Sequence, residues 1–317
     1  MASRFVRRFV ATYNGQPGTD VPVERNPAMK IAATADLHYN IARSKHSTEQ
    51  LAEELAETAP DVLILVGDLA GKRLDVLVHC FALFERLGCP RLYVPGNHEL
   101  WALPGQDSLD RYERLLPQAC RDCGVHYLDA APFVLERVAF VGNIGWYDYS
   151  FQSRRLRIPE RFYQAKVAPG AARALPQYRH LVEGHDDLGD GLLQIATRWM
   201  DGVHVTMDLD DRQFLSRLID RMTRHLSEAA SQADQIVAAV HHLPFVELVR
   251  YTDRDNWEFA NAYMGSQCLG EALLAEPKVR YVLCGHSHQA GRVTKEHLTC
   301  VNIGSTYTHK RYELLEL

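Results

Sequence analysis

The sequence lacks any apolar run of about 20 residues, the length that a membrane-spanning helix requires. No apolar core of a secretory signal follows the first residues either, so we expect a protein without a membrane partner. An excess of charge is also missing. The formal net charge of -5 gives no electrostatic argument for general nucleic-acid binding, which makes nucleic acid a less favoured partner.

Cysteine is too scattered for a disulfide framework or a structural zinc site. The chain has seven cysteines, an odd number, and only Cys120 and Cys123 have CxxC spacing, with no second pair to complete a zinc site. Without a signal peptide, this usage indicates reduced thiols and predicts a cytoplasmic location.

What the sequence does contain is an alternation of short apolar runs with helical patterns. We expect strands at 31–35, 62–66 and 91–94, separated by helices, and this order favours an α/β fold with a largely parallel sheet. Ser47 and Gln50 form a plausible capping box for the first helix. Later strands are expected at 138–142, 235–240 and 279–284, with an antiparallel finish at 293 and 299–303.

Residues 149–234 interrupt this alternation with Arg-rich, then acidic, then helical sequence. Apolar residues from Phe214 to Leu226 recur at helical spacing and predict an amphipathic helix. We interpret 149–234 as an insertion or cap in a domain spanning 30–317, with 1–29 as an N-terminal extension. Four arginines between 154 and 161 offer a site for an anionic substrate, although a solvated surface is the preferred interpretation.

Polar residues recur directly after the expected strands. Such strand ends converge on one edge of an open α/β sheet, where ligands bind, so we expect these residues to meet there. Gly67, Gly96 and Gly285 would let the chain turn sharply beside a ligand. The polar residues in question are Asp36, His38, Asp68, Asn97, His98, Glu99, His241, His242, His286 and His288.

These side chains offer oxygen and imidazole nitrogen donors and no thiolate, a set that suits divalent manganese, iron or zinc. These donors are too many for one metal ion that keeps coordination positions open for a substrate, and they are enough for two such ions. Asp68 is the natural bridge, because a carboxylate can place one oxygen on each of two cations. Two such cations lower the pKa of a bridging water and clamp the oxygens of a displacement at phosphorus.

The same residues resemble the sequence blocks of the calcineurin-like metallophosphoesterases, which run DxH, GDxx, GNH[DE], a later His at a strand end, and GHxH. The resemblance covers residues 30 to about 305 apart from the insertion, and five blocks in order are far more specific than any one. It implies a layered sandwich of mixed β-sheets flanked by helices, with a helical insertion. The matching blocks are Asp36-Leu37-His38, Gly67-Asp68, Gly96-Asn97-His98-Glu99, His241 and Gly285-His286-Ser287-His288.

The resemblance also implies roles for single residues. His98, which is not a ligand in this scheme, would contact phosphate together with Asn97 and protonate the leaving oxygen. Glu99 would orient His98 or a metal ligand. For the later histidine, His241 is preferred over His242, although the family's frequent His-x-Pro pattern would select His242. One ion would be held by Asp36, His38, Asp68 and His288, and the other by Asp68, Asn97, His241 and His286.

The leading hypothesis is therefore hydrolysis of phosphate mono- or diesters by a metal-bridging hydroxide, with a small phosphoester or a phosphoprotein as substrate. Two alternatives stay open: a nuclease of the same superfamily, which needs a basic path for the backbone, and a non-catalytic metal-binding scaffold. The sequence gives no code for the substrate, the metal or the oligomeric state.

Overall fold

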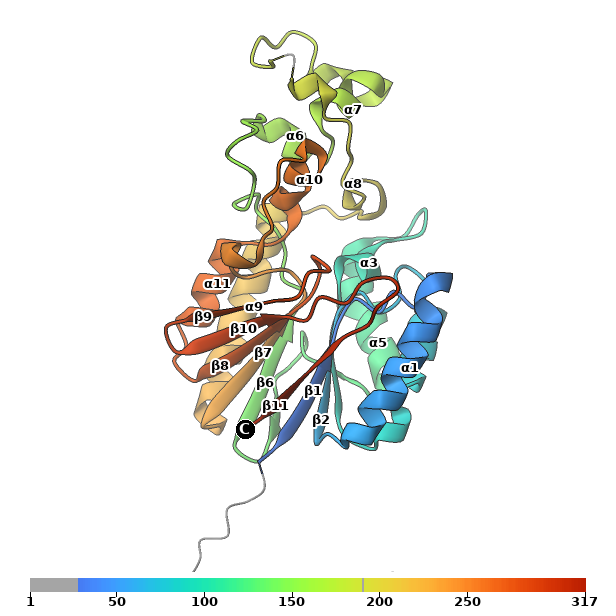
Figure 1. Ribbon diagram of the computed structural model, residues 1–317, viewed down its shortest axis with the longest axis vertical. Helices are drawn as coiled ribbons and strands as arrows, with labels where there is room; N and C mark the ends of the chain where they lie inside the picture. Colours follow the sequence, from blue (N-terminus) through green and yellow to red (C-terminus); the bar gives the residue numbers. More distant parts are fainter. Residues whose placement is uncertain (1–27, 190) are drawn as a thin grey trace, which may run out of the picture.

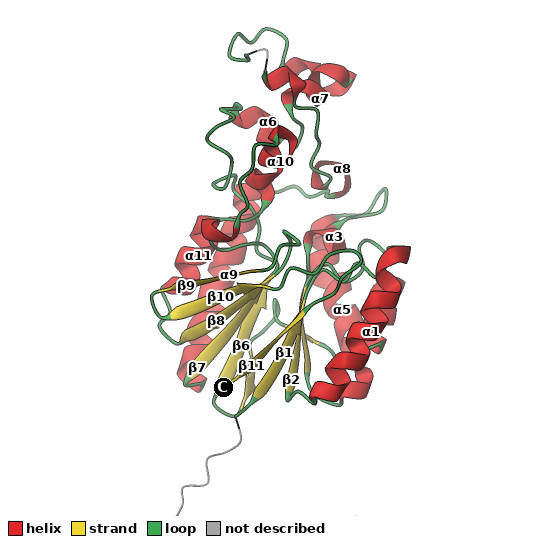
Figure 2. Ribbon diagram, in the orientation of Figure 1, coloured by secondary structure: helices red, strands yellow, loops and turns green. Residues whose placement is uncertain are grey.

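The computed structural model describes residues 28–189 and 191–317, and it places two β-sheets face to face with helices on their outer faces (Figures 1 and 2). The predicted extension lies outside the described residues except for Ala28 and Met29. The five-stranded sheet has the order β11 (Tyr312–Glu316), β1 (Lys30–Thr34), β2 (Val62–Val66), β3 (Arg91–Val94) and β4 (His126–Tyr127). The six-stranded sheet has the order β5 (Phe133–Leu135), β6 (Val138–Asn143), β7 (Gln235–Val240), β8 (Val279–Cys284), β10 (Leu298–Asn302) and β9 (Gly291–Lys295).

The inner strands of each sheet, such as β2 and β6, are buried on both faces, which explains the continuous apolar runs. In β2, Ile64 points into the core between the sheets, while Leu63 and Leu65 point into the core beneath the outer helices. The inner core joins residues of both sheets, such as Val94 and Phe140. This is the α/β layered sandwich of mixed sheets expected from the sequence, and its fold class is confirmed.

The outer helices bury their apolar faces against the two sheets. Helices α1 (Ala42–Thr58), α2 (Leu74–Ala82) and α5 (Leu116–Asp122) contribute to the core outside the five-stranded sheet. On the other side, α9 (Asp211–Gln232) and α11 (Gln267–Leu274) cover the six-stranded sheet. The predicted amphipathic helix is confirmed as α9, which packs Met222, Leu226 and Ala229 into that core.

The capping box predicted at Ser47 and Gln50 is wrong. The first helix begins at Ala42 after Ile41, so Ser47 lies inside the helix, where its hydroxyl donates to the carbonyl of Ser44. Ser47 therefore cannot cap this helix, because it lies past the first turn. A real capping box occurs at α9, between Asp210 and Gln213.

The interval 149–234 contains two kinds of structure. Short helices α6 (Glu160–Gln164), α7 (Pro169–Ala174) and α8 (Asp201–His204) lie beyond the sheet ends at the top of Figure 1, near α10 (Asp255–Ala260). Helix α9 instead runs along the six-stranded sheet. No helix among the described residues has the length and apolar character needed to cross a membrane.

Candidate metal centre

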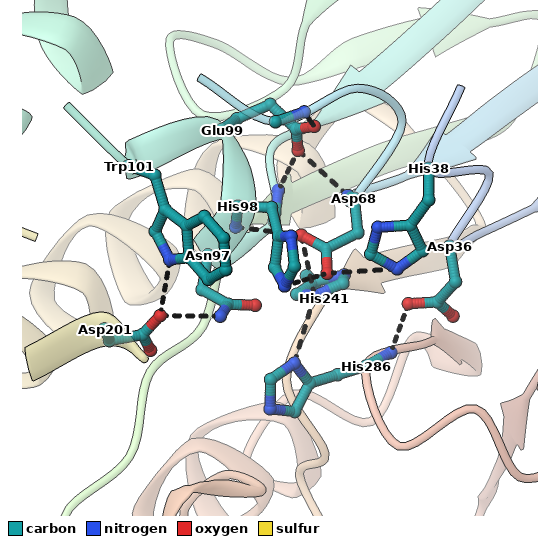
Figure 3. Close-up of polar contacts among 12 residues, drawn as sticks. Asp36, His38, Asp68, Asn97, His98, Glu99, Trp101, Asp201, His241 and His286 are labelled. Carbon is teal, nitrogen blue, oxygen red and sulfur yellow. Dashed lines mark hydrogen bonds and ion pairs between the residues drawn. The ribbon is translucent and has the colours of Figure 1, made fainter. Parts of the chain in front are cut away.

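The polar residues that follow the strands meet at one end of the sandwich, where both sheets contribute (Figure 3). The five-stranded sheet supplies Asp36 and His38 after β1, Asp68 after β2, and Asn97 at the start of α3 (Asn97–Leu100), which follows β3. The six-stranded sheet supplies its residues after β7 and β8, namely His241, His286 and His288. The expected convergence at strand ends therefore occurs across two sheets rather than along one.

One group of potential ligand atoms comprises Asp36, His38, Asp68 and His288, all within 4.8 Å of one another. The Nε2 atoms of His38 and His288 lie 3.1 Å apart. His38 Nε2 is 3.7 Å from Asp68 Oδ2, and His288 Nε2 is 3.8 Å from Asp36 Oδ1. Ligand atoms at about 2.1 Å from one shared ion lie about 3–3.4 Å apart, so this group needs only small shifts to surround a cation.

A second group comprises Asp68, His241 and His286. His241 Nε2 lies 3.5 Å from Asp68 Oδ1 and 3.2 Å from His286 Nδ1. Asp68 belongs to both groups, with one oxygen facing each. The neighbouring His242 belongs to neither group, so the geometry favours His241 over His242 as the ligand.

The backbone around these side chains is strained or tightly packed. Five candidate ligands have positive φ values although none is glycine: Asp36 (55°), His38 (43°), Asp68 (52°), His286 (70°) and His288 (57°). Such conformations cost about 1–3 kcal/mol each and gather at functional sites. A Cβ at Gly96 would lie 2.1 Å from Asp68 Oδ1, so only glycine lets these two loops approach.

Comparison with known proteins agrees with this arrangement. Residues 29–290 match the family model of the calcineurin-like phosphoesterases. The chain belongs to this family.

Two solved structures show the same fold at low sequence identity. Phosphopantetheinyl hydrolase (PptH) from Mycobacterium tuberculosis has a TM-score of 0.63 and 19% identity, covering 89% of this chain and 91% of that chain. A dimetal phosphatase from Danio rerio has a TM-score of 0.53 and 14% identity, covering 92% of this chain and 93% of that chain. No curated protein matches the sequence.

The donor set fits the divalent metals that this family uses. Asp36 and Asp68 are buried carboxylates, and uncompensated buried charge is costly. Burial raises the pKa of Asp36 to about 7, and the charge of Asp68 contributes to that rise. Asp36 Oδ2 and Asn97 Oδ1 are buried and accept no hydrogen bond from the described residues, which leaves both oxygens free to bind a cation.

The histidines are suited to the same role. Burial lowers the pKa of His38 and of His286 well below its usual value, and lowers that of His288 to about 4, so these rings are neutral near pH 7 and keep a lone pair for a metal. Burial also disfavours protonation of His241, but the charge and hydrogen bond of Asp68 outweigh it and raise its pKa to about 9. A divalent cation beside Asp68 would neutralise the Asp68 charge that raises the pKa of His241.

His98 lies beside both groups without belonging to either. Its backbone N–H donates to Asp68 Oδ1 at 3.0 Å, and its Nε2 lies 3.8 Å from Asp68 Oδ2. The ring stacks on Trp101 with centroids 3.8 Å apart. The side chain of His98 is 18% exposed, whereas those of His38 and His241 are fully buried, so its imidazole is within reach of a molecule entering from solvent.

Glu99 supports the loops rather than His98. Its fully buried carboxylate accepts four backbone N–H groups: Oε2 from Asp68 (2.9 Å) and Gly96 (2.8 Å), and Oε1 from Ala70 (2.8 Å) and Gly71 (3.1 Å). The loop that carries Asp68 and the loop that carries Asn97 are thereby tied to one side chain. This contact agrees with the expectation that Glu99 orients a ligand.

Asp201 is a neighbour of the site that sequence reasoning missed. This buried carboxylate accepts a hydrogen bond from Asn97 Nδ2 at 2.8 Å and from Trp101 Nε1 at 2.7 Å. Its second oxygen accepts from Tyr147 and from Trp199 Nε1. A carboxylate at the first position of the short helix α8, 104 positions from its partner Asn97, gives no motif by which it could be found.

Proposed function

We propose that the protein hydrolyses phosphate mono- or diesters with two divalent cations. One is held by Asp36, His38, Asp68 and His288, and the other by Asp68, Asn97, His241 and His286. Bound there, the cations would activate water and neutralise charge on the phosphate. The observation that carries the proposal is the position of His98, a partly exposed imidazole beside, and not within, the two ligand groups.

In this proposal the protein's own side chains divide the work. Asn97 and His98 contact the phosphate, and the His98 imidazole gives a proton to the leaving oxygen, because an alkoxide is a poor leaving group. Stacking on Trp101 and the backbone hydrogen bond to Asp68 hold His98 in place. Membership of the family supports phosphoester hydrolysis, and the two similar structures support the fold.

The test compares His98→Ala with His46→Ala, which removes an exposed histidine of α1 that belongs to neither ligand group. Both variants are loaded with Mn²⁺, their metal content is measured, and p-nitrophenyl phosphate and its bis ester are offered as substrates. We expect His98→Ala to keep two ions per chain and lose about 10²–10⁴-fold in turnover, most severely with poor leaving groups. Unchanged turnover would remove His98 from the mechanism.

The nuclease alternative receives less support from the described residues. Of the arginines that could form a basic path, Arg155 pairs with Asp255 at 2.6 Å and Arg161 pairs with Asp187 at 2.5 Å. Pairing with acids reduces the positive potential available to a nucleic-acid backbone. Salt-dependent DNA binding together with cleavage of the backbone would restore this alternative. A metal-loaded protein inactive on a broad phosphoester panel would instead favour the scaffold.

A further inference from the structure

A cleft of about 610 Å³ opens beside the candidate metal centre, and its walls differ in character from its floor. The floor is formed by Asp68, Asn97, His98, His286 and His288. The walls come from Trp101, from the segment around Trp199, and from α10 and the residues that follow it. The apolar side chains in these walls are Trp101, Trp199, Met200, Trp257, Ala260 and Met264.

Two of the wall indoles are fixed in place by hydrogen bonds. Trp199 Nε1 donates to Asp201 at 2.7 Å, and its ring stacks on Tyr263 with centroids 5.1 Å apart and planes 8° apart. Trp257 Nε1 donates to the carbonyl of Arg250 at 3.3 Å. Rigid aromatic side chains lose little conformational entropy when a ligand packs on them, so they make effective contact surfaces.

The walls also expose apolar surface that a solvated loop has no reason to keep. Trp257 is 42% exposed and Met200 is 43% exposed, and both face the same cleft. Among the described residues that line it, Arg198 is the one lysine or arginine. A cleft with a single such cation and several apolar walls is poorly suited to a polyanionic group and well suited to an apolar one.

We propose that this cleft binds the alcohol part of the substrate, and that this part is apolar and flat enough to pack on Trp199 and Trp257. The phosphate would then lie on the floor, beside His98. The proposal rests on the proposed function, since it assigns the substrate class of the same site. Ligand binding is therefore measured separately from hydrolysis.

The experiment measures binding of two non-hydrolysable probes to the Mn²⁺-loaded protein by calorimetry: 2-naphthylmethylphosphonate and methylphosphonate. We expect the naphthyl compound to bind at least about tenfold more tightly, because its rings leave water for the apolar walls. Trp257→Ala should reduce the preference to less than about threefold. Leu314→Ala, which removes an exposed apolar side chain outside the cleft, should leave the preference intact.

The outcomes separate the two proposals. Equal binding of both probes, or a preference that survives Trp257→Ala, would overturn the apolar subsite even if phosphate esters are hydrolysed. A clear preference for the naphthyl probe that depends on Trp257, in a protein that hydrolyses no ester, would keep the ligand class and overturn the proposed function.

A second inference comes from the hydrogen bonds of Asp201 and does not depend on the cleft. Asn97 Nδ2 donates to Asp201, so the opposite end of the amide, Oδ1, is directed away from Asp201 and is free of other protein partners among the described residues. An amide can rotate by half a turn and present its NH₂ group instead, which cannot bind a cation. We infer that Asp201 is a positioning residue that keeps the Asn97 oxygen turned toward the second ion.

Asp211 provides a matched control for Asp201. It also accepts from a tryptophan indole (Trp146, 2.8 Å) and from a tyrosine hydroxyl (Tyr149), and it pairs with Lys166. The hydrogen bonds that it makes do not involve a candidate ligand. If the substitutions act by disturbing packing, Asp201→Asn and Asp211→Asn should weaken Mn²⁺ binding alike. If the substitution at Asp201 acts by releasing the Asn97 ligand, only Asp201→Asn should weaken Mn²⁺ binding.

The readout is the affinity of the two Mn²⁺ ions in calorimetry. We expect Asp201→Asn to weaken the binding of one Mn²⁺ ion about 10–100-fold. Asp211→Asn should leave the affinities for both ions within about threefold of those of the parent protein. In an Asn97→Ala background, Asp201→Asn should have no further effect, because it acts through that amide. Equal losses in both backgrounds, or no loss of affinity in Asp201→Asn, would contradict the inference.

Discussion

Glu99→Gln tests how the ligand-bearing loops are held together. Each oxygen of Glu99 accepts two backbone N–H groups, Oε2 from Asp68 and Gly96 and Oε1 from Ala70 and Gly71. Glutamine is nearly identical in size, but it has one acceptor oxygen, and its NH₂ group would face two buried donors.

The expected loss follows from those two donors. Each buried N–H left without an acceptor costs about 1–3 kcal/mol, so the pair costs about 2–6 kcal/mol. Burial raises the pKa of Glu99, so removing its charge offsets part of the loss, and we expect the lower half of that range. With an m-value of about 3 kcal/mol per M, a loss of about 3 kcal/mol lowers the urea midpoint by about 1 M.

The assay is urea unfolding with chelator present, so that metal binding does not contribute. Glu258→Gln serves as the control: Glu258 is also buried, but its Oε1 accepts both the Thr252 N–H and the Asn261 amide, and glutamine can keep those contacts. A Glu99→Gln variant as stable as Glu258→Gln would show that the four hydrogen bonds do not hold the loops.

Two further predictions concern Gly96 and Asp129. Gly96→Ala places a Cβ 2.1 Å from Asp68 Oδ1 and should abolish binding of two Mn²⁺ ions in calorimetry, whereas Gly189→Ala, whose Cβ meets no described atom within 4 Å, should bind both. Burial raises the pKa of Asp129 to about 7, so the stability that its neutral form contributes is present below about pH 4 and is lost as the pH rises through 7. In urea titrations with chelator, Asp129→Asn should lose less stability than the parent between pH 4 and 8; parallel curves would contradict this.

Much of the fold could be predicted because its signals are local. The buried runs that form β1, β2 and β3 each stand out over a few residues, and both faces of their sheet are covered. Strand β4 was not predicted, because two residues are too few to show an alternation of apolar and polar side chains. Strand β11 was not predicted, because it is defined by its pairing with β1 at the opposite end of the chain. The prediction of a capping box at Ser47 was wrong, because the local sequence does not distinguish a helix start at Ser47 from the interior of a helix.

The same distinction applies to the site. The family blocks name the candidate ligands because each lies next to a strand whose end is predictable. Asp201 and Trp199 lie in a segment without strands or long helices, and only the folded chain brings them to Asn97 and the cleft. How the chain divides into a domain and an insertion stays a prediction.

The candidate ligands come from both halves of the sandwich, and this has a mechanical consequence. Between the sheet ends, Asp36 accepts from the His286 N–H, and the His241 ring contacts the Val66 carbonyl. Cations shared by side chains from both sides would fasten the two layers where they open toward solvent. Removing them should loosen that rim first, so amide exchange would quicken at the carboxyl ends of β1, β2, β7 and β8 well before their opposite ends.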